Sequence, residues 1–178
     1  FFPSDDEYAS LLMALATFGV GFFMRPVGGI LLGMYSDRKG RKAAMQMIIR
    51  LMTVSIALIA FAPNYAAIGM GAPLLIVVAR MLQGFATGGE YASATAFLVE
   101  SAPAHRKGLY GSWQLVGQCL AVFSGAAMVA LFTHLLSPEA LESWGWRIPF
   151  VLGLLIGPVG LWIRKHMEEP EEFLEARK

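Results

Sequence analysis

Long apolar stretches alternate with short polar ones along the whole chain. Five runs of membrane-spanning length are separated by segments that carry most of the charge. About 20 consecutive apolar residues cross the hydrocarbon core of a bilayer as a helix. The pattern predicts an all-α fold, a polytopic transmembrane helix bundle formed by residues 1–163. The predicted spans are residues 9–34, 43–62, 73–99, 109–136 and 148–163, followed by a charged tail or linker at 164–178.

The composition agrees with this prediction. Of the 178 residues, 56% are hydrophobic and 15% are charged, whereas soluble domains average about 45–50% apolar and about 25% charged residues. The sequence contains no phosphate-binding loop, no metal-ligand spacing and no nucleophile–base pattern. We therefore expect a lipid bilayer around the chain and no nucleic-acid partner. We also expect no catalytic residue, metal site or cofactor, and hence a protein that is not an enzyme.

The basic residues favour one orientation in the membrane. Ten of the 14 Lys and Arg residues lie in segments that this topology places on one side. Cytoplasmic loops of membrane proteins carry an excess of Lys and Arg. The pattern predicts a multi-pass protein of the cell membrane (inner or plasma membrane), with the amino end external and the basic loops and tail cytoplasmic. The ten residues are Arg38, Lys39, Arg41, Lys42, Arg106, Lys107, Arg164, Lys165, Arg177 and Lys178.

The densest basic segment, GMYSDRKGRK at residues 33–42, lies between the first two apolar runs. Its charge alone would suit a simple topology anchor. Its sequence resembles the pattern G-x-x-[AS]-D-[RK]-x-G-R-[RK] between the second and third helices of major facilitator superfamily transporters. The resemblance implies a latch between helix bundles, in which Glu100 pairs with Arg41 and Asp37 caps the next helix. The implied latch residues are Gly33, Asp37, Arg38, Gly40, Arg41 and Glu100.

Further stretches of the chain resemble one family within this superfamily. Residues 80–88, RMLQGFATG, resemble the R-x-x-Q-G-x-x-x-G pattern of the superfamily's fourth helix. MRPVGG, QGFATGGE, RKG and GWRIPF resemble segments of the metabolite:proton symporter family, whose members carry citrate, 2-oxoglutarate, shikimate, proline or betaine. The resemblance implies that the five spans are helices 2–6 of the usual twelve. It also implies two partners outside this chain, the first helix and the carboxy-terminal bundle of the same transporter.

Three arginines and one glutamate lie inside the predicted spans: Arg25, Arg50, Arg80 and Glu90. Each costs about 2.5–3.5 kcal/mol at a helix centre, so such residues usually face a watery path or one another. Glu90 is expected either to carry a coupled proton or to neutralise Arg50. The Arg25-Pro26 pair is expected to break the first span. On a helix, Gln83 and Thr87 share the face of Arg80, and the residues expected to bind substrate are Arg25, Arg80, Gln83 and Thr87.

With the resemblance, these features predict a secondary active transporter that moves a small organic acid together with protons by alternating access. A di- or tricarboxylate such as citrate or 2-oxoglutarate is the expected substrate. One alternative is proton symport of a zwitterionic osmolyte, proline or betaine. A quaternary ammonium group would need an aromatic cage, for which the spans offer Phe18, Phe22, Phe23 and Trp113. Another alternative is a membrane scaffold that transports nothing.

Overall fold

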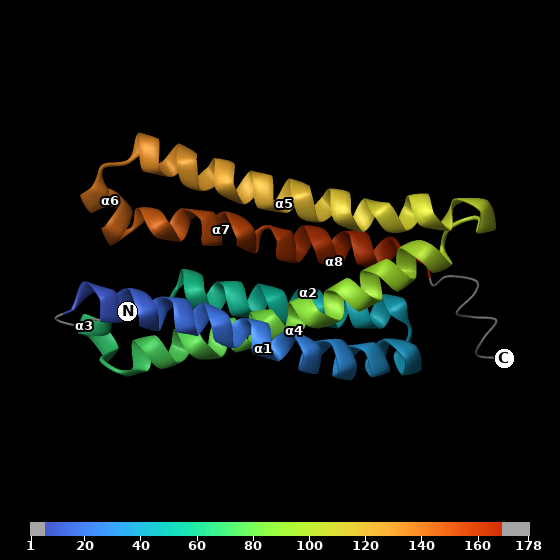
Figure 1. Cartoon of the computed structure of the whole chain (residues 1–178), viewed down its shortest axis with the longest axis horizontal. Coiled ribbons are helices and arrows are strands. Elements are labelled where there is room, and N and C mark those ends of the chain that lie inside the picture. The colour runs from blue at the N-terminus through green and yellow to red at the C-terminus, as the bar shows by residue number, and fades with distance from the viewer. Residues whose placement is uncertain (1–5, 169–178) are drawn as a thin grey trace.

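The computed structural model describes residues 6–168, which form helices and connecting turns and contain no strand. Five stretches are long and apolar enough to cross a membrane, so the prediction of five spans is confirmed. They run along one axis, and the chain reverses at each end (Figure 1). The spans are α1 (Glu7–Lys39), α2 (Arg41–Ala60), α4 (Gly71–Glu100), α5 (Lys107–Leu135) and the consecutive α7 (Ile148–Leu154) and α8 (Ile156–His166), connected through α3 (Tyr65–Ile68), η1 (Ala104–Arg106), α6 (Pro138–Ser143) and η2 (Gly145–Arg147).

The helices pack most densely around α4. This helix lies against α1 and α2, while α7 and α8 lie against α2. Most of the buried apolar side chains belong to α1, α2 and α4, and one cluster joins Leu32, Ile48 and Ala86. In contrast, α5 contacts the others mainly through α4 and contains no buried residue. Apolar side chains on such a surface are compatible with lipid, because lipid tails are as apolar as leucine.

Glycines allow α1 and α4 to cross at backbone contact. A Cβ atom added to Gly28 would lie 1.9 Å from a carbonyl oxygen of α4, and one added to Gly84 would lie 1.9 Å from the carbonyl oxygen of Gly21. Gly88 faces the carbonyl oxygen of Arg25 in the same way, at 2.0 Å. Small residues give helices in lipid this close van der Waals contact. The crossing therefore places the backbone of Arg25 directly against α4.

The expectation that Arg25-Pro26 breaks the first span is wrong, because α1 is continuous across Pro26. Proline has no N–H group, so the helix loses the bond that residue 26 would otherwise donate to the Phe22 carbonyl oxygen. Membrane helices tolerate such a loss when neighbouring groups compensate. Here Gly21 and Gly28 pack against α4 on both sides of Pro26, which holds the two halves of α1 in one helix.

The basic segment 33–42 is mostly helical rather than a loop. Helix α1 continues to Lys39 and α2 begins at Arg41, so Gly40 alone joins them. Gly40 has a φ of 105°, a conformation that residues with a side chain rarely adopt. Its N–H group donates to the Ser36 carbonyl oxygen at 2.9 Å. The predicted antiparallel hairpin is therefore made with a single residue between two helices.

The fifth span extends past its predicted end. Helix α8 continues to His166 and packs on α2. Arg164, which the sequence placed in the charged tail, is therefore part of a packed helix. The tail residues 169–178 lie outside the described residues.

Candidate functional site

Four polar side chains line one hollow between α1 and α4, with a volume of about 130 Å³. Helix α1 contributes Arg25, and α4 contributes Arg80, Gln83 and Thr87. These are the four residues that the sequence singled out for substrate binding, and the close crossing of the two helices brings them together. The rest of the lining consists of Phe18, Gly21, Phe22, Met52 and Gly84.

The two arginines are positioned by local contacts. Arg80 Nη1 donates to Gln83 Oε1 at 2.7 Å, and the Arg80 guanidinium lies 5.4 Å from the centre of the Phe18 ring. The Arg25 guanidinium lies 4.0 Å from the centre of the Phe22 ring. Within residues 6–168, neither arginine forms an ion pair with a carboxylate. Because a guanidinium has five N–H donors, the hollow presents two positive charges with donors available to an anion.

A second hollow, of about 390 Å³, adjoins the first because Thr87 lines both. It lies between α4 and α5, and two amides one helical turn apart, Gln114 and Gln118, reach it from α5. These two glutamines were not among the site residues predicted from the sequence. Two amides four residues apart, on one face of a mostly apolar span, were the signal that would have identified them. The lining consists of Thr87, Glu90, Tyr91, Gln114, Gly117, Gln118 and Ala121.

Glu90 also borders a third hollow, of about 670 Å³, whose walls are mainly apolar side chains of α2 and α8. There Glu90 Oε1 lies 3.7 Å from Arg164 Nη2. A second nitrogen of Arg164, Nη1, donates to the Met45 carbonyl oxygen at 3.1 Å. Arg50 is exposed on α2. The suggestion that Glu90 neutralises Arg50 is therefore wrong, because the ion-pair partner of Glu90 is Arg164.

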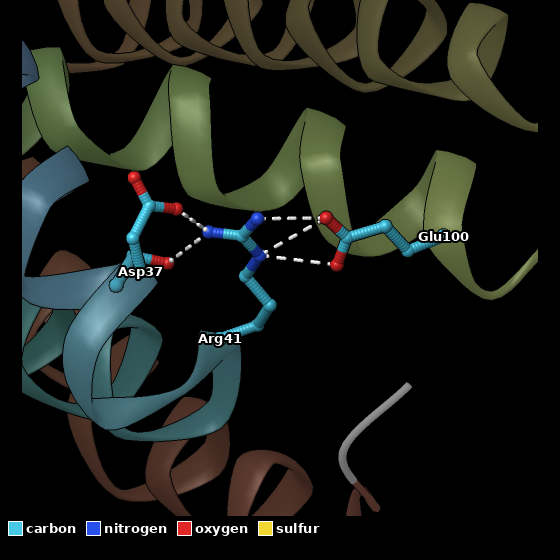
Figure 2. A network of polar contacts seen from close by, with 4 residues as sticks. Asp37, Arg41 and Glu100 are labelled. Carbon is cyan, nitrogen blue, oxygen red and sulfur yellow. Dashed lines mark hydrogen bonds and ion pairs between the residues drawn. The ribbon is translucent and has the colours of Figure 1, made fainter. Parts of the chain in front are cut away.

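Arg41 joins three helix ends near the carboxy-terminal end of α4 (Figure 2). Its Nε donates to both carboxylate oxygens of Glu100 at 3.2 and 3.0 Å, and its Nη2 donates to Glu100 Oε1 at 2.7 Å. Its Nη1 donates to Asp37 Oδ1 and to Ser36 Oγ. One guanidinium thus ties the end of α1 and the start of α2 to the end of α4. We call Asp37, Arg41 and Glu100 the latch cluster.

The other residues implied for the latch have different positions. Gly40 makes the turn beside the cluster, Arg38 is exposed in the last turn of α1, and a Cβ on Gly33 would have no described atom within 4 Å. Asp37 does not cap α2, because the cap residue is Gly40 and no side chain bonds to the cap. The Asp37 carboxylate instead accepts from the Arg41 side chain.

Double-mutant cycles are expected to give different coupling free energies for the two ion pairs of the latch cluster. The Glu100 side chain is 20% exposed and that of Asp37 is 68% exposed. The coupling of Arg41 with Glu100 should be roughly 1.5–3 kcal/mol, as for other hydrogen bonds to charged groups. The coupling with Asp37 should be below about 1 kcal/mol, as for exposed ion pairs. The measurement is the change in free energy of unfolding in detergent for Arg41→Gln, Glu100→Gln, Asp37→Asn and the two double variants, and equal couplings would contradict the prediction.

Comparison with known proteins places these features in a family. The sequence model described as "Sugar (and other) transporter" matches residues 2–175. The chain belongs to this transporter family. The predicted resemblance to transporters is thereby confirmed, and the family assignment agrees with the expectation that the chain is not an enzyme. With five membrane-length helices, the chain is part of a multi-pass membrane protein.

Several characterised relatives align with almost the whole chain. The citrate-proton symporter of Klebsiella pneumoniae is 44% identical over 99% of this chain and 40% of its own length. The shikimate transporter of Escherichia coli K12 is 41% identical over 97% of this chain and 40% of its own length. The proline/betaine transporter of Salmonella typhimurium is 40% identical over 97% of this chain and 35% of its own length. The chain therefore spans 40% or less of the length of these relatives.

Solved structures show the same fold. The inward-open xylose transporter XylE from E. coli superposes with a TM-score of 0.79 at 20% identity, over 96% of this chain and 40% of that one. A partially occluded form of XylE gives a TM-score of 0.81 at 21% identity, over 99% and 44% of the two chains. XylE is described as a proton:xylose symporter of the major facilitator superfamily. The predicted fold, part of a major facilitator helix bundle, is confirmed.

Proposed function

We propose that this chain is the larger part of the amino-terminal bundle of a proton-coupled symporter for small organic acids. The observation that carries the proposal is the pair of arginines, Arg25 and Arg80, which line one hollow and have no carboxylate partner within residues 6–168. Cations inside a membrane are retained where they face a polar path or an anion. Carboxylates form charge-assisted, often bidentate bonds with arginine, so a substrate carboxylate is the natural ligand of this hollow.

The relatives support the same chemistry. Citrate, shikimate, proline and betaine, the compounds in their names, differ in size and charge but all carry a carboxylate. Gln83 and Thr87 lie beside the arginines and would hydrogen-bond to further oxygen atoms of the substrate. The remaining walls of the binding site would come from the first helix and the carboxy-terminal bundle, which the relatives' greater length suggests as partners.

An organic acid is favoured over the osmolyte alternative by the aromatic residues of the hollow. Phe18 and Phe22 already have the guanidinium groups of Arg80 and Arg25 near their rings. A quaternary ammonium would need these ring faces and would be repelled by both arginines. The other two candidate cage residues, Phe23 and Trp113, are 83% and 61% exposed and do not line this hollow.

We place the latch cluster on the cytoplasmic side of the cell membrane and the amino end outside. Basic residues gather at one end of the bundle, where α1 ends, α2 and α5 begin and α8 ends. The excess of Lys and Arg in cytoplasmic loops supports this orientation. In this arrangement the amino-terminal and carboxy-terminal bundles rock about the substrate-binding site between them. The latch cluster stabilises one of the two states of the alternating-access cycle, outward-facing or inward-facing. Glu90 carries the coupled proton.

Uptake into proteoliposomes tests the proposal. With the full-length protein and an imposed inside-alkaline pH gradient, labelled citrate is expected to accumulate, and a protonophore that collapses the gradient should abolish the accumulation. Unlabelled di- and tricarboxylates should compete, and betaine should not. Competition by betaine as strong as by citrate would favour the osmolyte reading. Uptake no higher than in protein-free liposomes, for every organic acid tested, would favour the alternative of a membrane scaffold that transports nothing.

A further inference from the structure

Two phenylalanines lie beside the two arginines of the hollow between α1 and α4. Phe18 and Phe22 are one helical turn apart on α1, and both line this hollow. Their rings pack edge to face, with centres 5.4 Å apart and an angle of 66° between the planes. This is a favoured arrangement of two aromatic side chains, and it leaves each ring at least one face that the other ring does not cover.

Each of these rings has one guanidinium over it. The Arg25 Cζ atom lies 4.0 Å from the centre of the Phe22 ring, and the Arg80 Cζ atom lies 5.4 Å from the centre of the Phe18 ring. Both distances are within the roughly 6 Å over which a cation is attracted to the negative face of an aromatic ring. The four side chains thus form one series of contacts, in the order Arg25, Phe22, Phe18 and Arg80.

The helix crossing fixes the backbones of the two arginines but not their side chains. A Cβ atom on Gly21 would lie 3.1 Å from the Arg80 carbonyl oxygen, and one on Gly88 would lie 2.0 Å from the Arg25 carbonyl oxygen. In the part of the chain that the structure describes, neither guanidinium has an ion-pair partner. The contacts that hold the two guanidinium groups in place are therefore the ring faces and, for Arg80, the bond to Gln83.

We propose that Phe18 and Phe22 are positioning residues, whose ring faces take the place of a counter-ion and hold the two guanidinium groups ready for a substrate carboxylate. Arginine stacks on aromatic rings through its flat guanidinium face, whereas its five N–H donors lie in the guanidinium plane. The rings therefore attract the two cations without occupying the donors that bind a carboxylate. A carboxylate side chain in the same place would occupy them. This inference rests on the proposed binding of a substrate carboxylate by Arg25 and Arg80.

Fluorinated phenylalanines at position 22 test this role in the full-length protein, because fluorine weakens the negative ring face and changes the shape of the ring little. Each added fluorine should raise the KM for uptake of labelled citrate into proteoliposomes, by roughly 2- to 30-fold in total for a trifluorinated ring, the range expected for loss of a cation–π contact. The maximum rate should change little. The same series at Phe18 should give a smaller rise, because Arg80 lies farther from its ring and also bonds to Gln83. A KM that does not depend on fluorination at Phe22 would overturn the proposal, since a purely steric role predicts that result.

Phe23 is the matched control. It is adjacent to Phe22 on α1, but it is 83% exposed and does not line the hollow. The same fluorinated series at Phe23 should leave the KM for citrate unchanged. An equal rise at both positions would overturn the proposal, because it would show that α1 responds to fluorine without any contact to an arginine.

Natural substitutions and a binding measurement complete the test. Phe22→Leu keeps an apolar side chain but has no ring face, so its KM should rise at least as much as with the trifluorinated ring, and a wild-type KM would overturn the proposal. Phe22→Tyr restores the ring face and should bring the KM back towards the wild-type value. Calorimetric titration of the purified full-length protein with citrate reports the affinity without transport. A wild type that neither binds nor accumulates citrate would contradict the proposed function and this inference with it, whereas citrate binding that fluorination leaves unchanged would contradict this inference alone.

Discussion

Replacing Arg80 with glutamine is expected to abolish uptake of organic acids without loss of the protein from the membrane. Arg80 is half-buried, lines the hollow between α1 and α4 and bonds to Gln83 at 2.7 Å. Glutamine keeps a polar side chain but removes the positive charge that a substrate carboxylate would meet. Loss of a hydrogen bond to a charged group costs about 1.5–3 kcal/mol, and a loss near 3 kcal/mol corresponds to roughly 100-fold in affinity. The measurement is the initial rate of labelled citrate uptake at several concentrations.

The control for this prediction is Arg50→Gln. Arg50 is also an arginine within an apolar helix, but it is exposed on α2 and does not line the hollow. Its replacement should leave the uptake rate close to that of the wild type. Unchanged uptake in Arg80→Gln, or an equal loss in both variants, would remove Arg80 from the site and with it the main support for organic-acid transport.

Gly28→Ala is expected to destabilise the bundle more than a single methyl group usually does. The new Cβ atom would lie 1.9 Å from the Phe85 carbonyl oxygen, which is backbone and cannot rotate away. The two helices would have to separate, and overpacking of this kind costs about 1–3 kcal/mol or more. We expect a lower yield of folded protein, a lower midpoint of thermal unfolding in detergent and a loss of uptake, because the hollow with Arg25 and Arg80 depends on this crossing.

Gly19→Ala on the same helix is the matched control. A Cβ atom on Gly19 would have no described atom within 4 Å, and alanine favours helix over glycine by about 1 kcal/mol. This variant should be as stable as the wild type or slightly more stable. Equal destabilisation by both substitutions would show that α1 responds to any change at glycine and that the close crossing is not the cause.

The local sequence pattern predicted the helix boundaries incompletely at two places, the hairpin after α1 and the proline within α1. The sequence predicted that residues 33–42 make a hairpin, but it suggested a longer loop than the single residue Gly40 that the structure shows. It also suggested a break at Pro26, where α1 is continuous. At Pro26 helix packing overrides the local signal, because backbone groups inside a membrane gain more from helical hydrogen bonds and close contact than proline removes. At residues 33–42 both helices continue until Gly40, whose positive φ reverses the chain.

The sequence by itself determined the number of spans, the helical fold and three of the charged residues that line the hollows, Arg25, Arg80 and Glu90, because runs of apolar residues and rare charges within them are visible without coordinates. It also indicated which residues of α4 share one face, since helical periodicity is a local property. The tertiary structure decided which of these charges meet. Only the packing of α8 on α2 brings Arg164 to Glu90 across more than 70 positions of sequence, and only the glycine crossing of α1 and α4 joins Arg25 to Arg80 in one hollow. Such pairs depend on how helices distant in sequence are placed in space, and the residues of a single helix do not encode that placement.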